Sequence, residues 1–257
     1  MQPGPMRNAY LDALGIERWV PRQGAEQSAP LPEAADEPQP EASRERLTGA
    51  APPAQARAPL PAPVPLGPIT DWGVLRERVA GCTACDLCKT RTQTVFGVGN
   101  TRAEWLIIGE APGAEEDRQG EPFVGRAGQL LNAMLLAIGL PRETVFIANI
   151  LKCRPPGNRD PKPEEVSRCL PFLSAQIALL KPKIMLAVGR IAAQNLLGTD
   201  VPLARLRGKL HHFGEANTPL VITYHPAYLL RSPADKRKAW EDLKFARATW
   251  ARLAGTN

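Results

Sequence analysis

Short apolar runs alternate along the chain with segments whose apolar residues recur every three or four positions. Four runs predict buried strands, at 105–109, 145–151, 183–189 and 220–224. The helical spacing predicts helices between and around these runs, at 72–80, 127–138, 163–177, 190–197 and 234–253. Strands that alternate with helices are typical of an α/β fold, so we expect a mostly parallel sheet with helices on both faces.

The first 70 residues lack this pattern and hold 14 of the 27 prolines but no cysteine, lysine or phenylalanine. Residues 23–70 are rich in Ala, Pro and Glu and cannot bury enough apolar surface to fold, so we expect a disordered linker. Residues 1–22 include an apolar island at 7–22. We interpret it either as a peptide that docks on a replication or repair protein, or as a helix that packs on its own domain. The folded domain is expected over 71–257.

The basic balance of the chain belongs to the part that is expected to fold. Residues 71–257 carry 26 Lys and Arg against 18 Asp and Glu, a net charge of +8, whereas residues 1–70 carry 6 Arg against 8 acids. This charge suits a nucleic-acid partner, and a basic enzyme without such a partner is the alternative. No apolar run approaches the roughly 18 residues of a membrane span, and the amino terminus lacks the apolar core of a signal peptide. We expect a monomer in the cytoplasm, with no membrane partner.

Residues 109–125 join the first predicted strand to a helix, at the strand end where open α/β sheets bind ligands. The segment has glycines that allow close backbone approach, but no Gly-Lys-Ser/Thr follows and its acids repel phosphate, which excludes a nucleoside triphosphate site. Five residues that could line a ligand pocket are predicted at this same edge: Glu110, Ala111, Phe123, Asn149 and His225. Each alone has an ordinary interpretation, as a core ring, a turn cap or a satisfied polar group. Their common location predicts a pocket.

Four of the five cysteines suggest a metal site. Cys82 and Cys85 have C-x2-C spacing, while Cys153 and Cys169 lie 16 positions apart. In the cytoplasm, metal ligands or free thiols are favoured over disulfides. Four thiolates suit zinc or an iron–sulfur cluster, and the spacing does not distinguish between them. Cys88 extends the first pair to C-x2-C-x2-C and can replace one member, and scattered core cysteines are the other alternative.

Five motifs occur in order along the folded part: Gly-Glu-Ala-Pro-Gly at 109–113 with Glu116 and Asp117, Pro-Phe-Val-Gly-Arg-Ala-Gly-Gln-Leu-Leu at 122–131, Asn149, Lys-Cys-Arg-Pro-Pro-Gly-Asn-Arg-Asp-Pro at 152–161, and His-Pro-Ala-Tyr-Leu-Leu-Arg at 225–231. Together they resemble the family 4 uracil-DNA glycosylases, the 4Fe-4S members of their superfamily. The resemblance covers about 72–253. It implies a three-layer α/β/α fold with a central four-stranded parallel sheet. It also implies that the 4Fe-4S cluster is held by Cys82, Cys85, Cys153 and Cys169, which leaves Cys88 as a non-ligand.

The same resemblance implies that the protein flips uracil out of DNA and hydrolyses its N-glycosidic bond, the start of base excision repair. Phe123 offers a ring to stack on the base, and the Asn149 amide matches uracil N3–H and O4, a pattern that cytosine reverses. Glu116 is expected where the methyl group of thymine would lie. His225 is expected to hydrogen-bond the developing charge on uracil O2. No strong general base is evident, because Ala111 stands where other branches carry an aspartate. Either Glu110 positions the attacking water, or stabilisation of the leaving group by His225 supplies most of the rate.

Contacts to DNA are expected from basic residues of three loops: Arg154, Arg159, Lys162, Arg205, Arg207, Lys209 and Arg231. Some of these basic residues are expected to be ordinary solvated surface. Leu229, Leu230 and Arg231 follow His225 and are expected to wedge into the gap that the flipped base leaves. Two other function classes stay open. One is a non-catalytic iron–sulfur DNA-binding or polymerase-associated module, and the other is a zinc-containing α/β hydrolase of a small metabolite. Release of uracil from an oligonucleotide separates the glycosylase from both.

Overall fold

The structure is a computed structural model that describes residue 67 and residues 69–255. The chain divides into two units, 1–53 and 54–257, and every described residue belongs to the second. The predicted docking peptide and nearly all of the predicted linker therefore lie outside the described residues. Within the described part, no helix combines the length and the apolar character needed to cross a membrane.

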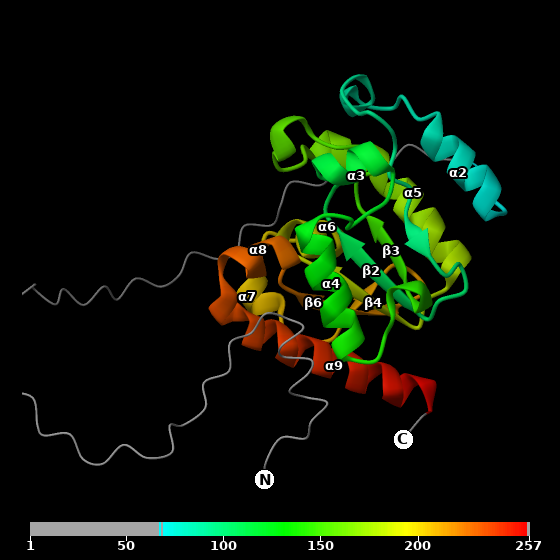
Figure 1. Ribbon diagram of the computed structural model, residues 1–257. Helices are drawn as coiled ribbons and strands as arrows, with labels where there is room; N and C mark the ends of the chain where they lie inside the picture. Colours follow the sequence, from blue (N-terminus) through cyan, green and yellow to red (C-terminus); the bar gives the residue numbers. More distant parts are fainter. Residues whose placement is uncertain (1–66, 68, 256–257) are drawn as a thin grey trace, which may run out of the picture. The chain divides into compact units, whose positions relative to one another are not determined.

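A sheet of six strands forms the centre of this unit (Figure 1). The strands are β1 (Val98–Gly99), β2 (Trp105–Gly109), β3 (Phe146–Asn149), β4 (Ile184–Val188), β5 (His211–Phe213) and β6 (Thr218–Thr223). Their order across the sheet is β1-β3-β2-β4-β6-β5. The inner strands β3, β2, β4 and β6 are parallel, whereas β1 and β5 pair antiparallel at the two edges.

The expected number of four strands is wrong, because two antiparallel edge strands, β1 and β5, extend the sheet to six. The four predicted strands are its parallel centre. β1 has only two residues, and β5 reads His-His-Phe within a basic stretch. Neither is an apolar run, because an edge strand is only partly covered and its side chains stay partly in solvent. Hydrophobic periodicity alone therefore could not reveal them.

Helices and helical turns connect the strands. The α-helices are α2 (Trp72–Ala80), α3 (Ala114–Gln119), α4 (Arg126–Ala137), α5 (Pro163–Leu180), α6 (Arg190–Leu197), α7 (Leu203–Leu206), α8 (Pro226–Arg231) and α9 (Lys236–Ala254). The 3-10 turns are η1 (Asp86–Lys89), η2 (Arg142–Thr144), η3 (Pro156–Asn158) and η4 (Pro233–Asp235). The five predicted helices are present as α2, α4, α5, α6 and α9. The short helices α3, α7 and α8 lie in segments that were expected to be loops.

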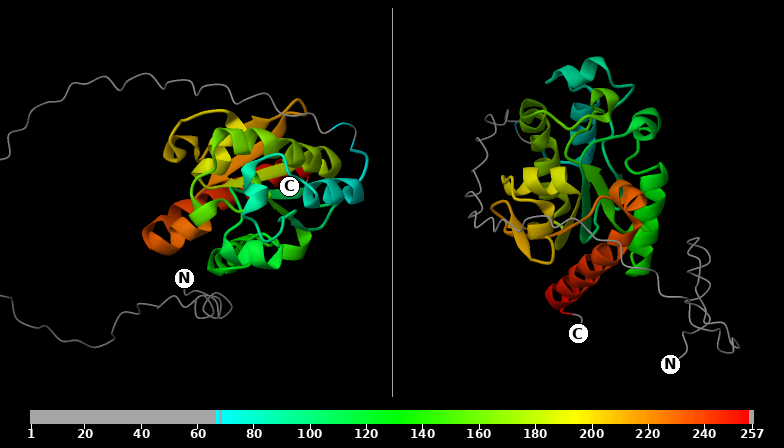
Figure 2. Two further views of the ribbon diagram at one scale, coloured as in Figure 1. Left: turned by 90° about the horizontal axis from the view of Figure 1, so that it is seen from above. Right: turned by 90° about the vertical axis from the view of Figure 1, so that its left-hand side faces the viewer.

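The sheet is covered on both faces, which gives three layers (Figures 1 and 2). Successive strand residues point to opposite faces. In β2, Leu106 and Ile108 pack with the core that includes residues of α2, α5 and α6. Ile107, between them, packs with the core that includes residues of α4 and α9. Every residue of β2, β3 and β4 is buried, which explains why these strands read as unbroken apolar runs.

The parallel register brings the carboxyl ends of the inner strands to one edge. Gly109 of β2 is level with Asn149 of β3, and Val188 of β4 is level with Thr223 of β6. From the central strand β2, the chain first adds β3 on one side and later β4 on the other. This reversal of strand order opens a crevice at the strand ends, where α/β folds place their sites.

Candidate active site

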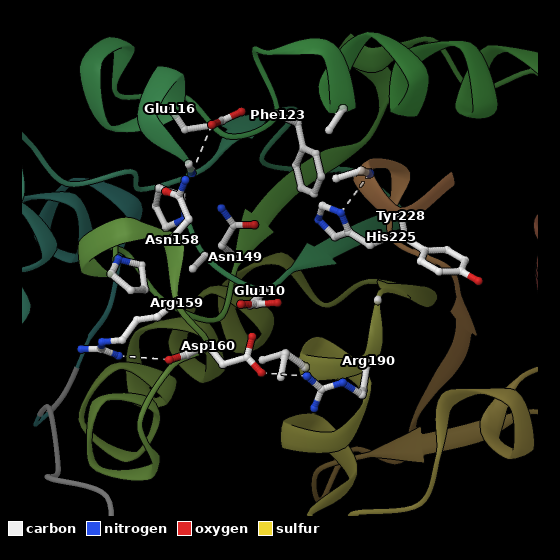
Figure 3. Close-up of a pocket in the computed structure, with 18 of the residues that line it drawn as sticks. Glu110, Glu116, Phe123, Asn149, Asn158, Arg159, Asp160, Arg190, His225 and Tyr228 are labelled. Atoms are coloured by element: carbon white, nitrogen blue, oxygen red, sulfur yellow. Dashed lines mark hydrogen bonds and ion pairs between the residues drawn. The ribbon is translucent and has the colours of Figure 1, made fainter. Parts of the chain in front are cut away.

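A cavity of about 690 Å³ lies at this edge of the sheet (Figure 3). Its size is typical of small-ligand sites. All the side chains that the sequence assigned to substrate line it: Glu110, Ala111, Glu116, Phe123, Asn149 and His225. Residues that the sequence did not assign to the pocket complete its wall, among them Asp160, Arg190 and Tyr228. Segments far apart in the sequence therefore meet around one cavity.

Asn149 forms the floor at the end of β3. Its side chain is 2% exposed, and its Oδ1 accepts no hydrogen bond from the described part of the chain. A buried acceptor without a donor is costly, by about 1–3 kcal/mol, unless a ligand supplies the donor. A Cβ at Gly109 would lie 2.3 Å from Asn149 Oδ1 and 2.7 Å from the Phe123 ring. Glycine is therefore needed at position 109 for these two side chains to approach each other.

Phe123 is held in an unusual backbone conformation. Its φ of 55° falls in the left-handed region, which costs a residue with a side chain about 1–2 kcal/mol. The Arg142 guanidinium supports it, donating from Nη2 to the Pro122 carbonyl at 2.6 Å and from Nη1 to the Phe123 carbonyl at 3.4 Å. Gly128 also allows this geometry, because a Cβ there would lie 1.8 Å from the Phe123 carbonyl oxygen. The ring is thus fixed by long-range contacts that no local pattern indicated.

His225 is the N-cap residue of α8, and this role determines which nitrogen of its ring carries the hydrogen. Its Nδ1 accepts the backbone N–H of Ala227 at 3.1 Å, so the ring hydrogen is assigned to Nε2. Burial, together with the nearby positive charge of Arg231, lowers the pKa of His225 to about 4, while Glu116 opposes the shift. The imidazole is therefore neutral at pH 7 and offers an Nε2–H donor within the cavity (Figure 3).

Glu110 follows β2 and lies close to a second carboxylate. Burial, together with the charge of Asp160, raises the pKa of Glu110 to about 7, while Arg190 opposes the shift. Arg190 Nη2 donates to Asp160 Oδ2 at 2.7 Å, so these two side chains are held together across the cavity wall (Figure 3). Glu110 therefore exchanges a proton near neutral pH, as a general base requires. Arg190 is the first residue of α6, just after β4, so its position at a strand end could have placed it at the cavity, although its pairing with Asp160 has no local signal.

Glu116 is committed to the loop that surrounds it. Its Oε2 accepts the N–H of Gly113 at 3.1 Å, and its Oε1 accepts the N–H groups of Val124 at 3.1 Å and Gly125 at 3.4 Å. Three charge-assisted hydrogen bonds hold the carboxylate in one place. The two ends of the segment 113–125 are thereby tied together beside the cavity.

All five cysteines line a second, separate cavity: Cys82, Cys85, Cys88, Cys153 and Cys169. No three acidic, cysteine or histidine side chains of the described residues form a ready-made metal site. The donor set nevertheless fits a thiolate-bound metal. The backbone N–H of Lys152 donates to Cys169 Sγ at 3.2 Å, and Arg91 Nη1 donates to Cys153 Sγ at 3.0 Å. Hydrogen bonds to sulfur of this kind support metal-bound thiolates.

The residues expected to contact DNA differ in how they are held. Lys162 and Arg231 are exposed. Arg154 donates from Nε to Asn158 at 2.8 Å, and Arg159 donates to both carboxylate oxygens of Glu165, at 2.5 and 2.9 Å. Arg205 and Lys209 are also exposed, in the basic stretch after α6.

Two of the residues expected to meet DNA are instead enclosed by protein. Leu229 is 1% exposed and belongs to the core, whereas Leu230 next to it is 36% exposed. The Arg207 side chain is 14% exposed, donates from Nε to Asp242 Oδ2 at 2.7 Å and lies over the ring of Tyr224. The sequence could not separate these residues from their exposed neighbours.

Comparison with known proteins gives consistent matches. Residues 96–244 match the family described as the Uracil DNA glycosylase superfamily. The chain is similar to the type-4 uracil-DNA glycosylase of Archaeoglobus fulgidus, with 45% identity over 177 residues, 66% of this chain and 88% of the relative. The enzyme of that name from Pyrobaculum aerophilum is 45% identical over 179 residues, 67% of this chain and 91% of its own. The one from Thermotoga maritima is 42% identical over 179 residues, 68% and 92% respectively.

Proposed function

This chain belongs to the uracil-DNA glycosylase superfamily, and from that membership we propose that it excises uracil from DNA by hydrolysing the N-glycosidic bond, the first step of base excision repair. The observation that carries the proposal is the buried Asn149 Oδ1, which lacks a donor among the described residues. Uracil N3–H supplies one, and the Asn149 amide N–H donates in return to uracil O4. Cytosine presents the opposite pattern at both positions and leaves buried groups without partners, so it is rejected.

Phe123 and Glu116 complete the selection of the base. The flipped base stacks on the Phe123 ring, which its backbone contacts hold at the cavity wall. Glu116 excludes the methyl group of thymine, because three backbone hydrogen bonds prevent its carboxylate from moving aside. Selection against thymine therefore depends on the rigidity of this segment.

His225 stabilises the leaving group. As the glycosidic bond breaks, the base becomes an anion and the sugar becomes cation-like. The neutral imidazole donates its Nε2–H to uracil O2, and it does so from a buried position where electrostatic interactions are strong. A neutral donor also avoids the cost of burying an imidazolium next to the apolar ring of Phe123.

Glu110 positions the attacking water and accepts its proton. Its pKa of about 7 leaves a large ionised fraction at neutral pH while keeping the carboxylate basic. The next residue, Ala111, has only a methyl side chain, which can neither position the water nor accept its proton. Asp160 and Arg190 adjust the pKa of Glu110 in opposite directions.

We assign Cys82, Cys85, Cys153 and Cys169 to a 4Fe-4S cluster, with Cys88 outside the ligand set. When bound, the cluster supplies a structural cross-link between the segment before β2 and the segments after β3. The N–H donors of Arg91 and Lys152 support two of the four sulfurs.

DNA lies across the carboxyl edge of the sheet in this proposal. Lys162 and Arg231 contact phosphates, together with Arg154 and Arg159 after they exchange their present partners. Leu230 is the wedge residue in place of Leu229, which is buried in the core. The cytoplasm as the place of action, and the docking of residues 7–22 on a replication or repair protein, stay predictions from the sequence.

Uracil release tests the proposal directly. The full chain, with its iron content measured, is incubated with matched oligonucleotides that carry uracil, cytosine or thymine at one position. Release of uracil alone supports the proposal. Lack of release by the iron-loaded protein, with DNA binding intact, overturns it in favour of a non-catalytic DNA-binding module. Asn149→Leu, which keeps the volume but removes the amide, is expected to lose most of the uracil activity.

A further inference from the structure

Lys152 is a fully buried lysine that lies between the two sites. It is 1% exposed, and its ammonium donates to the backbone carbonyl of Asn149 at 2.8 Å and to Gln176 Oε1 at 2.7 Å. Gln176, which is 0% exposed, passes the link on by donating from Nε2 to the Phe96 carbonyl at 2.8 Å. The backbone N–H of Lys152 donates to Cys169 Sγ. One residue thus touches both the floor of the base pocket and a cysteine of the metal site.

Lys152 is joined to each site by a different part of the residue. Its ammonium is held by two neutral oxygens, the Asn149 carbonyl and Gln176 Oε1, so its side chain ties the end of β3 to α5. Its backbone precedes Cys153 and donates from its N–H to Cys169 Sγ at 3.2 Å. A change at either end of Lys152 is therefore passed to the other through this one residue.

We propose that Lys152 is a positioning residue that couples the cysteine site to base recognition. Its ammonium holds the backbone of Asn149 at the end of β3, and its own backbone is held by the hydrogen bond from its N–H to Cys169 Sγ. Gln176 completes the arrangement by fixing the direction of the ammonium. The inference rests on the proposed roles of Asn149 and of the cysteines. It goes beyond them because it makes the cluster a support for selectivity and assigns a function to a lysine that contacts no substrate.

A double-mutant cycle tests the link to Asn149. Lys152→Met keeps the length of the side chain but removes its donors and charge. We expect it to lower the single-turnover rate on uracil DNA about 10- to 100-fold, the range found when supporting residues of a site are removed. In the Asn149→Leu background, Lys152→Met should change the rate less than about 2-fold, because Lys152 acts through Asn149. Lys183→Met is the matched control; Lys183 pairs with Glu104 before β4 and should leave the rate unchanged.

The outcomes separate this inference from the proposed function. An unaltered rate in Asn149→Leu refutes the recognition role of Asn149 itself. Two results refute only the coupling. One is that Lys152→Met slows the already slow Asn149→Leu enzyme by the same factor as it slows the original enzyme. The other is that Lys152→Met alone leaves the original rate unchanged. If Lys152→Met does not fold, Gln176→Met tests the same link to Asn149, because it keeps Lys152 but removes one of the two oxygens that hold its ammonium. It must slow the original enzyme at least 3-fold and the Asn149→Leu enzyme by less than about 2-fold, and equal factors overturn the inference.

Iron retention tests the other half of the coupling without an activity measurement. The purified protein and Lys152→Met are exposed to a colorimetric iron chelator, and the release of iron is followed with time. Loss of the two hydrogen bonds from the ammonium leaves the segment that carries Cys153 less firmly held, so release should be at least 3-fold faster than from the Lys183→Met control. Equal release from all three proteins would show that Lys152 and the cysteine site are independent.

Discussion

The ring of Phe123 lies 5.6 Å from the imidazole ring of His225, measured between centroids, with the two planes tilted by 31°. The two residues are 102 positions apart in the sequence and are held at this distance by different contacts. Phe123 is held through its backbone by Arg142, and His225 is held as a helix cap by Ala227. An aromatic ring and a hydrogen-bond donor are therefore held next to each other in the wall of one cavity.

His225→Ala should lower kcat about 100- to 1,000-fold with little change in KM, because it removes a donor that acts as charge develops on the base. Single-turnover kinetics on uracil DNA measure the effect, and His212→Ala on the exposed side of β5 is the control. The low pKa of His225, about 4, adds a second expectation. Its donor should not titrate between pH 5 and 8, and a rate that requires protonated histidine in that range would contradict the assigned role.

The pH profile should instead report Glu110. Its pKa is raised to about 7, so the carboxyl is mostly protonated below that pH and ionised above it. If the ionised form is the base, the rate rises as pH increases through about 7 and reaches a plateau above it. Glu110→Gln should abolish this rise and lower the plateau about 100-fold, the lower end of what a general base contributes. If the rate of Glu110→Gln still increases with pH around the same midpoint, the titrating group is not Glu110.

Asp160 and Arg190 should move that midpoint in opposite directions. Asp160 raises the pKa of Glu110 and Arg190 lowers it. Asp160→Asn removes the negative charge, so the midpoint should shift to lower pH. Arg190→Met removes the positive charge and frees Asp160, so the midpoint should shift to higher pH. Rate–pH profiles of the two variants at constant ionic strength measure the shifts, and shifts in the same direction would contradict the arrangement.

Arg142→Met should destabilise the protein and slow catalysis together. The change deprives two backbone carbonyls, those of Pro122 and Phe123, of their guanidinium donor. Buried acceptors left in this way cost about 1–3 kcal/mol, seen as a lower urea midpoint with an unchanged slope. The stacking ring loses its support, so kcat/KM should fall as well. Arg102→Met, at an exposed position, controls for loss of an arginine.

The sequence predicted the parallel centre of the sheet because β2, β3 and β4 are buried on both faces and read as apolar runs. It also brought Asn149 and His225 to one edge, because both follow strand ends. It could not identify Arg142, which acts on a backbone carbonyl 19 positions away, or the pair of Asp160 with Arg190, which are 30 positions apart. Such contacts depend on the packing of elements and leave no local pattern.

Burial explains the remaining differences. Leu229 and Leu230 are adjacent and chemically identical, yet Leu229 lies in the core that includes residues of α4 and α9, whereas Leu230 is exposed, because α8 packs with only one of its faces. Lys152 gave no signal in the sequence, since lysine is ordinarily a surface residue. Its burial results from the packing of the end of β3 near α5, which brings the Asn149 carbonyl and Gln176 to its ammonium.

Arg231 and Arg207, both expected to bind DNA from the sequence, should now respond differently to substitution. Arg231 is exposed at the end of α8, so Arg231→Ala should weaken binding to abasic-site DNA and reduce the slope of log Kd against log salt by about 1. Arg207 is enclosed by Asp242 and Tyr224, so Arg207→Ala should leave that slope unchanged. It should instead lower the free energy of unfolding by about 3–5 kcal/mol, because Asp242 stays buried without its partner. Salt titrations and urea unfolding of both variants distinguish the two roles, and a reduced salt slope in a stable Arg207→Ala protein would return that residue to the DNA interface.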